Sequence, residues 1–216
     1  MIEFETLRGL THREVAGRLL AAGWDVSGTG DWAVVWRSPD GAQVARVCAF
    51  EPAYGIFVRL CRDLAGHPML PRIDFDAELS GGGRLTVMEF LRPAEPGEAA
   101  SVKERWEAAA VGDPITALRR AAERLDAEAA AACSFWGGLD FNPGNVMRRE
   151  DGELLLLDLF YANGPEIYRV LLEDPAQIAA AFPAQKRRFL CEIAAIARES
   201  TTRELAELRA AAAAIG

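Results

Sequence analysis

The spacing of the apolar residues changes once along the chain, and this change limits the fold more than any other feature of the sequence. Between Trp24 and Leu91 the apolar residues form short alternating runs that end at turns rich in Gly and Pro. After Ser101 they recur at the three- and four-residue spacing of helices. Runs of strands followed by runs of helices are typical of α+β proteins. We therefore expect an α+β fold, with a small antiparallel sheet followed by a mainly helical part.

The first part of the chain is expected to contain two helices beside its strands. Thr11 and Glu14 have the spacing of a capping box, which starts a helix. Pro52 stands where the first residue of the second helix would be, and Gly66 would end it. The expected elements are helices at 12–22 and 53–65 and strands at 24–27, 33–37, 43–48, 71–79 and 84–91.

The stretch 92–101 is rich in Pro, Glu, Ala and Gly, as linkers are. We place the boundary between two lobes at its start, which gives an N-lobe of residues 1–91 and a helical C-lobe of residues 92–216. Asp113 and Pro114 then predict the start of a long helix that ends near residue 132. The remaining expectations are a short helix at 106–110, a non-helical segment at 135–161 and three or four helices at 165–215.

Composition and charge exclude several classes of function. The 24 basic and 32 acidic residues give a net charge of −8, which disfavours binding to the phosphates of nucleic acid. No apolar run approaches the ~18 residues that a membrane-spanning helix needs. The acidic start, Met1–Glu5, lacks the basic and apolar regions of a signal peptide. We expect no nucleic-acid or membrane partner, and a cytoplasmic protein unless a non-Sec route exports it.

The cysteines and histidines do not have the spacing of a zinc site. Cys48, Cys61 and Cys191 lie in apolar stretches, which predicts reduced, buried thiols. Neither His12 nor His67 has a second histidine at the spacing that zinc sites use.

Small residues cluster between the first two expected strands, in the pattern Gly28-x-Gly30-x-x-Ala33-x-Val35. Had this pattern opened a helix, it would favour a dinucleotide site at the helix N-terminus. Between two strands, it favours backbone amides laid over the phosphates of a nucleotide. Taken alone, such a pattern more often marks a simple turn.

A second group of polar residues interrupts an apolar region. Asp140 and Asn145 belong to the segment Asp140-Phe141-Asn142-Pro143-Gly144-Asn145, and Asp158 follows thirteen residues later inside an apolar run. A carboxylate in such a run is costly unless it meets a cation. An Asn oxygen and an Asp carboxylate suffice for Mg²⁺ that also binds substrate phosphates. Asp140 would then accept the proton of an attacking hydroxyl. The alternative makes Asp140 a turn residue and Asp158 a helix cap.

Together these segments resemble those of the protein-kinase-like superfamily, which includes protein kinases and aminoglycoside and choline phosphotransferases. Gly28–Val35 resembles the Gly-rich loop, Asp140–Asn145 the catalytic loop and Leu157–Leu159 the metal-binding Asp segment. Met88–Leu91 resembles the hinge that binds adenine through its backbone. The resemblance covers about residues 24–165, includes a helix at the place of the C-helix, and implies a two-lobed fold of a minimal bacterial member.

The resemblance also implies the site residues and ATP and Mg²⁺ as cofactors. It gives catalytic roles to Asp140, Arg46 and Asn145, and metal binding to Asn145 and Asp158. The residues implied to contact the nucleotide are Gly28, Thr29, Gly30, Ala33, Val35, Val44, Arg46, Met88, Glu89 and Leu91.

Several positions depart from the family pattern. The strand lysine that contacts phosphate is replaced by Arg46, because the chain has no lysine before Lys103. Arginine has a larger, forked head and is not equivalent to lysine. Neither Glu51 nor Asp63 is well placed as the C-helix glutamate. Gly138 and Phe160 stand where the family has a histidine and a glycine. Trp32, at the tip of the glycine loop, would cover bound phosphate or stand exposed.

The acceptor is less constrained by the sequence. Only 49 positions separate Leu91 from Asp140, which leaves no room for the helical insertion of small-molecule phosphotransferases. Only 58 residues follow Asp158, and no Ala-Pro-Glu segment occurs among them. These features favour a minimal protein Ser/Thr kinase of the effector or toxin kind. One alternative is a small-molecule hydroxyl kinase, which the sequence Asn-Pro-Gly-Asn-Val at 142–146 favours. The other is a pseudokinase that binds nucleotide or protein.

Overall fold

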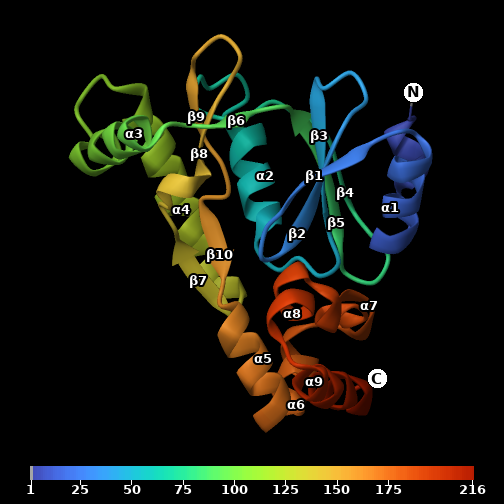
Figure 1. The fold of residues 1–216 in the computed structure, drawn as a ribbon. Helices are drawn as coiled ribbons and strands as arrows, with labels where there is room; N and C mark the ends of the chain where they lie inside the picture. The colour runs from blue at the N-terminus through green and yellow to red at the C-terminus, as the bar shows by residue number, and fades with distance from the viewer. Residues whose placement is uncertain (1) are drawn as a thin grey trace. The chain divides into compact units, whose positions relative to one another are not determined.

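The computed structural model describes residues 2–216, whose contacts divide them into two compact units (Figure 1). Unit 1 consists of the segment that ends at Glu51, Asp74–Met88 and Asn163–Gly216. Unit 2 consists of Pro52–Ile73 and Glu89–Ala162. This grouping differs from the boundary expected at residue 91, because it places residues 163–216 with the N-terminal strands.

Unit 1 is built on a five-stranded sheet with the strand order β1-β2-β3-β5-β4. β2 pairs antiparallel with both β1 and β3, and the register of β1 shifts between Val26 and Gly28. The strands are β1 (Asp25–Thr29), β2 (Ala33–Arg37), β3 (Gln43–Cys48), β4 (Ile73–Glu78) and β5 (Arg84–Glu89).

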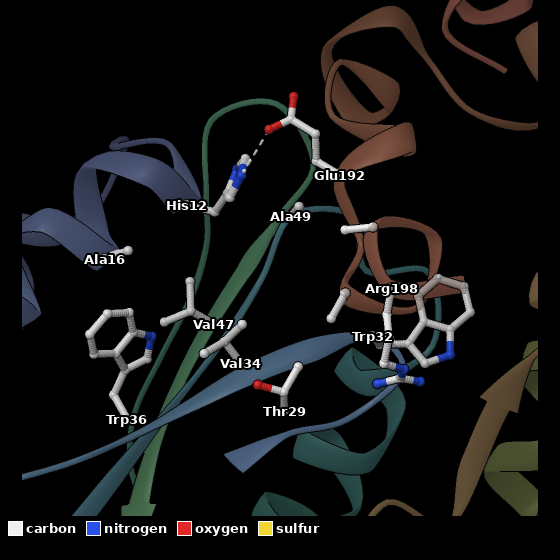
Figure 2. Close-up of a pocket in the computed structure, with 12 residues that line it drawn as sticks. His12, Ala16, Thr29, Trp32, Val34, Trp36, Val47, Ala49, Glu192 and Arg198 are labelled. Carbon is white, nitrogen blue, oxygen red and sulfur yellow. Dashed lines mark ion pairs between the residues drawn. The ribbon is translucent and has the colours of Figure 1, made fainter. Parts of the chain in front are cut away.

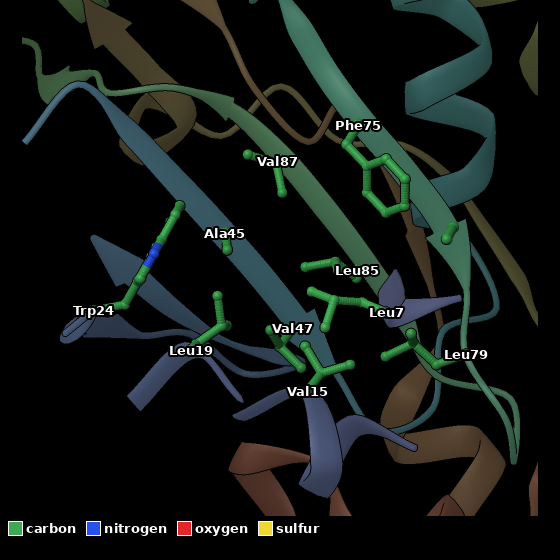
Figure 3. Close-up of a cluster of buried hydrophobic side chains, with 11 residues drawn as sticks. Leu7, Val15, Leu19, Trp24, Ala45, Val47, Phe75, Leu79, Leu85 and Val87 are labelled. Carbon is green, nitrogen blue, oxygen red and sulfur yellow. The ribbon is translucent and has the colours of Figure 1, made fainter. Parts of the chain in front are cut away.

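Helix α1 (His12–Ala21) covers part of one face of this sheet (Figure 3). The predicted capping box is present: Glu14 N–H donates to Thr11 Oγ1, and the Glu14 carboxylate accepts from Thr11 N–H. Val15 and Leu19 of α1 are fully buried against residues of β3, β4 and β5, as is Leu7 of the 3₁₀ helix Phe4–Leu7. Burying a side chain such as Leu19 contributes about 1.5–3 kcal/mol. The α1 face therefore forms the core of unit 1.

The C-terminal helices of unit 1 pack at one end of this sheet (Figure 1). The glycines of the β4–β5 turn make this contact close: a Cβ on Gly82 would overlap the Lys186 carbonyl, and one on Gly81 would overlap the Phe189 ring. Lys186 also pairs with Glu78 at 2.7 Å. The helices are α5 (Gly164–Glu173), α6 (Pro175–Ala181), α7 (Ala184–Arg187), the 3₁₀ helix Leu190–Glu192, α8 (Ala194–Glu199) and α9 (Thr202–Ala214).

Unit 2 combines helices with short strands. Asp113 caps the long helix α4, because its side chain accepts from Ile115 N–H, as the sequence predicts. Helix α2 packs against α4 and β10, with an ion pair between Arg59 and Glu128 at 2.8 Å. The elements are α2 (Tyr54–Asp63), β6 (Arg92–Pro93), α3 (Pro96–Ala108), α4 (Pro114–Ala132), β7 (Trp136–Leu139), the 3₁₀ helix Pro143–Asn145, β8 (Val146–Arg148), β9 (Leu154–Leu156) and β10 (Phe160–Ala162).

Two expectations about local structure were wrong. The stretch 92–101 is not a linker: Arg92 and Pro93 pair with β8, and α3 begins at Pro96. Glu98 stabilises this start, because its carboxylate accepts from Glu95 N–H at 3.0 Å. Residues 165–215 also contain more helical segments than the three or four expected, although helices do begin at the expected interruptions at Pro175 and after Pro183. Among residues 2–216, no helix is both long and apolar enough to cross a membrane.

Candidate functional site

The structure brings Asp140, Asn145 and Asp158 together within unit 2. Asp140 directly follows β7, and its N–H donates to Leu159 O at 2.9 Å. Leu157 N–H donates to Asn145 O at 2.8 Å, and Asn145 Nδ2 donates to Asp158 O at 3.2 Å. The segments 140–145 and 157–159 therefore run side by side.

A compact turn directs Asn145 back toward Asp158. Asn142 Oδ1 accepts from Gly144 N–H at 2.8 Å, and Asn145 N–H donates to Asn142 O at 2.8 Å. Pro143 begins the 3₁₀ helix because its fixed φ suits the first helical position. The Asn142-Pro143-Gly144 sequence thus explains how the chain reverses between Asp140 and Asn145.

Asp158 has an unusual backbone conformation. Its φ is +50°, and among residues 2–216 the only other non-glycine residue with positive φ is Ala109, which follows the C-terminus of α3. Such conformations are sparsely populated in residues other than glycine, and they cluster at functional sites. Asp158 is half-buried, whereas Asp140 is exposed. The strained residue is therefore the one expected to bind a metal ion.

Residues that the sequence reasoning missed position β7 beside this cluster. Trp136 Nε1 donates to Asp126 Oδ1 of α4 at 2.7 Å. The ring of Tyr161 lies against Gly137 so closely that a Cβ at position 137 would overlap it. Tyr161 pairs with Gly138 in the β7–β10 ladder, and 42% of its surface is exposed. No sequence motif marks Asp126 or Tyr161, because their role depends on strand pairing and helix packing.

Most of the residues of β1, β2 and β3 that are expected to contact the nucleotide share one face of the sheet in unit 1, but Thr29 lies on the other face. In an antiparallel pair, directly opposite residues point to the same face. Gly28 is opposite Val35, and Val35 is opposite Arg46. Ala33 and Val44 have the same alternation and lie on this face too. It is the face opposite to α1, whose side of the sheet carries Thr29, Val34 and Val47 (Figure 2).

Arg46 forms a buried ion pair with Glu51. Arg46 Nη1 lies 2.5 Å from Glu51 Oε2, and the two side chains are 10% and 4% exposed. Glu51 follows β3 and precedes α2, and its N–H donates to Gly82 O. Glu51 lies outside helix α2, as expected, but it is the acidic partner of Arg46, which the sequence did not predict. Burial raises the pKa of the Cys48 thiol, and the negative charge of Glu51 raises it further.

The tip of the glycine loop is attached to α8. Gly30 N–H donates to Ala33 O at 3.0 Å within the loop. Asp31 O accepts from Ala195 N–H at 2.8 Å, and Asp31 Oδ1 accepts from Arg198 Nη2 at 2.7 Å. Trp32 neither stands exposed nor projects freely, since its ring packs near Phe50 and Gly164. The loop tip is thus tied to the C-terminal segment of its own unit.

The expected hinge residues differ in their surroundings. Met88 and Leu91 are buried. Glu89 accepts two hydrogen bonds from Arg149, at 2.8 and 2.9 Å, and one from Arg72 N–H at 2.8 Å. Burial raises the pKa of Glu89, but these donors outweigh it and the net shift is downward. The Glu89 side chain therefore stays ionised as a structural clamp.

The donor set at Asn145 and Asp158 fits a hard cation better than zinc. Among residues 2–216, no group of three or more His, Cys, Asp or Glu side chains is arranged to hold a metal ion. One amide and one carboxylate remain, which suit Mg²⁺ that takes its other ligands from phosphate and water. The Asn145 amide donates through Nδ2, so its oxygen is the atom left for a cation.

Comparison with known proteins gives limited support. No family model matches the sequence, and no curated protein matches it. Among solved structures, the kinase domain of Mycobacterium tuberculosis PknI is similar over 88% of this chain and 96% of that chain, with 16% sequence identity and a TM-score of 0.31. This is a weak structural similarity to a protein kinase domain, too weak to support an argument about function.

Proposed function

We propose that this protein is an ATP- and Mg²⁺-dependent phosphotransferase that transfers the γ-phosphate to a hydroxyl, with Ser or Thr of a protein as the acceptor. The observation that carries the proposal is the set of hydrogen bonds that join the segment of Asp140 and Asn145 to the segment of Asp158, with Asp158 in a strained conformation. An isolated turn residue and an isolated helix cap would not need to be linked in this way.

Each residue of this cluster has one role in the proposal. Asn145 and Asp158 would hold Mg²⁺, which neutralises charge on the phosphates when it is bound. Asp140 would accept the proton of the acceptor hydroxyl as its oxygen forms the bond to the γ-phosphorus. The bond from that phosphorus to the bridging oxygen breaks, and ADP leaves with the electron pair. Asp140 is exposed, as a base that must reach a substrate from solution should be.

The nucleotide is proposed to bind through the face of the sheet opposite to α1. Arg46, held by Glu51, would contact the phosphates, together with the backbone of Gly28, Thr29 and Gly30. Ala33, Val35 and Val44 would supply apolar contacts to the base. Met88, Glu89 and Leu91 would supply the hinge contacts.

A protein acceptor is preferred to a small molecule. The short connection between Leu91 and Asp140 contains α3 and α4, and no further helix is present to enclose an acceptor. An exposed Asp140 also suits an acceptor that is itself a folded surface. A small-molecule kinase is the alternative that the experiment below separates.

A second candidate is a binding module without transferase activity. It is favoured by the attachment of Asp31 to α8, which restrains the loop that would cover the phosphates. It is also favoured by Arg46 in place of lysine, because the guanidinium is already engaged by Glu51 at 2.5 Å.

Labelled ATP separates these functions. We expect the wild-type protein, with Mg²⁺, [γ-³²P]ATP and cell extract, to transfer label to a discrete protein band. Asp140→Asn should lower transfer by about 10²–10⁴-fold, the usual contribution of a general base, while it leaves ATP affinity unchanged. Asp158→Asn should weaken Mg²⁺-dependent ATP binding measured by calorimetry. Glu150→Gln, an exposed substitution in the same unit, is the matched control.

The other outcomes contradict the proposal in different ways. Label found only in small molecules would replace the protein acceptor with a metabolite hydroxyl. ATP binding without transfer to any acceptor would leave the binding module. Wild-type transfer in both Asp variants would remove the assigned roles of Asp140 and Asp158.

A further inference from the structure

A cavity of about 680 Å³ lies on the α1 side of the sheet in unit 1 (Figure 2). Val34 and Val47 form its floor, and Ala16 of α1 and Trp36 of β2 line one side. Trp32 and Arg198 line the other side, and His12 and Glu192 lie at one end. Ala194 and Ala197 also line the cavity. Sites for small molecules usually have volumes of about 300–1,000 Å³.

The cavity exists because α1 covers only part of the sheet. The large side chains of α1 that face inward, Val15 and Leu19, pack over β3, β4 and β5. The residue turned toward β1 and β2 is the small Ala16. Nearby apolar surface is exposed as well: Leu20, one helical turn after Ala16, is 63% exposed, and Val26, opposite Trp36, is 54% exposed.

Two buried nitrogen atoms of the lining residues have no hydrogen-bond partner. They are Trp36 Nε1 and His12 Nδ1, and the described residues contain only one other such nitrogen or oxygen atom, Arg187 Nε. Figure 2 shows the nitrogen edge of Trp36 turned toward Val47 and Val34. An unpaired buried donor or acceptor costs about 1–3 kcal/mol, which a ligand could recover.

The two nitrogens need different partners. Trp36 Nε1 is a donor only, so it needs an acceptor. His12 Nε2 lies 3.3 Å from Glu192 Oε2, a contact that requires the proton on Nε2 and leaves Nδ1 of the neutral ring as an acceptor. A hydroxyl can serve either nitrogen, since it both donates and accepts. A carboxylate can serve only Trp36, and an ammonium only His12.

The charged residues at the cavity also favour an uncharged ligand. Arg198 Nη2 lies 2.7 Å from both Asp31 Oδ1 and Glu199 Oε1. Glu192 lies 2.7 Å from Arg13. Each charge at the cavity is therefore already paired, and a charged ligand would have to displace one of these partners.

We propose that this cavity binds a small, uncharged and mainly apolar ring compound that carries a hydroxyl group. The apolar floor and the two indoles contact the ring, and the hydroxyl bonds to an unpaired nitrogen. Because Thr29 and Trp32 belong to the glycine loop, the ligand also contacts that loop from the side opposite to Arg46. The binding site is independent of ATP, so it is tested without nucleotide.

Four probes of similar shape test the proposal by calorimetry on the full chain: 1-naphthol, 1-methylnaphthalene, 1-naphthoate and 1-naphthylmethylammonium. We expect 1-naphthol to bind at least fivefold more tightly than each of the others. Ala16→Phe, which fills the cavity, should weaken 1-naphthol binding at least tenfold. Ala21→Phe, on an exposed position of the same helix, is the matched control and should bind as the wild type does.

Trp36→Phe removes the indole donor and makes this side chain smaller, which leaves the cavity open, so it remains informative if Ala16→Phe fails to fold. It should reduce the preference for 1-naphthol over 1-methylnaphthalene. The proposal is overturned if no probe binds up to its solubility limit, if Ala16→Phe and Ala21→Phe bind equally, or if a charged probe binds as tightly as 1-naphthol. An unchanged hydroxyl preference in both Trp36→Phe and His12→Phe would also overturn it.

Discussion

Removal of the Glu51 carboxylate should show how strongly unit 1 depends on a buried ion pair. In the wild type, Arg46 and Glu51 are 2.5 Å apart and their side chains are 10% and 4% exposed. Glu51→Ala leaves the Arg46 guanidinium buried beside β2 without this counter-charge. The guanidinium stays protonated, because arginine does not lose its proton in proteins. The folded state is destabilised because the unfolded chain hydrates Arg46 fully.

The size of the effect follows from the separation and the burial. Two unit charges about 4 Å apart attract by about 4 kcal/mol at an effective dielectric constant of about 20. Removal of one partner from a buried pair typically costs about 3–5 kcal/mol. With a urea dependence of about 2 kcal/mol per molar, the unfolding midpoint should fall by about 2 M.

Urea unfolding, followed by tryptophan fluorescence and by circular dichroism, measures this shift. The matched control is Glu207→Ala, which breaks the Arg203–Glu207 pair at 3.6 Å between side chains that are 86% and 54% exposed. An exposed pair one helical turn apart contributes about 0.3–0.5 kcal/mol, so this midpoint should hardly move. The double variant Arg46→Met/Glu51→Leu should recover most of the lost stability, because it removes both charges.

The reasoning is refuted if Glu51→Ala and Glu207→Ala shift the midpoint equally. It is also refuted if the double variant is less stable than Glu51→Ala, because the apolar pair would then fit the site worse than a buried guanidinium that has lost Glu51.

Two further predictions concern the contacts of unit 1. Gly82→Ala should lower the free energy of unfolding by about 2–5 kcal/mol, because Gly82 has a φ of +98° and the new Cβ would overlap the Lys186 carbonyl. The control is Gly152→Ala, which has a φ of +94° and open space around it, and which should lose only about 1–2 kcal/mol in the same urea assay. Equal losses in the two variants would exclude a contribution from the contact between Gly82 and Lys186. The second prediction concerns the pKa of His12. Burial lowers this pKa below 6.5, Glu192 opposes the shift, and Arg13 adds to it. The folded protein then binds fewer protons than the unfolded chain between its own His12 pKa and 6.5, so stability should fall as the pH drops through this window. His12→Phe should reduce that fall in thermal unfolding from pH 7 to 5, and an unchanged pH profile would contradict it.

Local signals in the sequence predicted α1 and the strands of the sheet in unit 1, the long helix of unit 2 and the turn within the candidate site. The capping box at Thr11, the N-cap at Asp113 and the alternation in 33–37 and 43–48 each involve residues close in sequence, whose preferences favour one conformation. The same holds for the turn that joins Asp140 to Asn145. The contact between Asn145 and Asp158 was predicted from a spacing of thirteen residues, through the resemblance to a known family.

The remaining features depend on contacts between residues far apart in the chain. Glu51 lies in a connection where no periodic pattern indicates its direction, so its pairing with Arg46 could not be inferred. The contact of Gly82 with Lys186 spans 104 positions of sequence, and it helps to place residues 163–216 in unit 1. The helix that begins at Pro96 was missed because the Pro, Glu, Ala and Gly residues of 92–101 are also typical of a linker.

The assignment of residues 163–216 to the same unit as β1–β3 has a consequence for biosynthesis. The chain passes between the units four times, at 51–52, 73–74, 88–89 and 162–163. A ribosome releases β1, β2 and β3 long before it adds the residues that contact Asp31 and Gly82. The strands and α1 can therefore bury their shared apolar core during synthesis, whereas the contacts of Asp31 and Gly82 form only after residues 186–198 have been made.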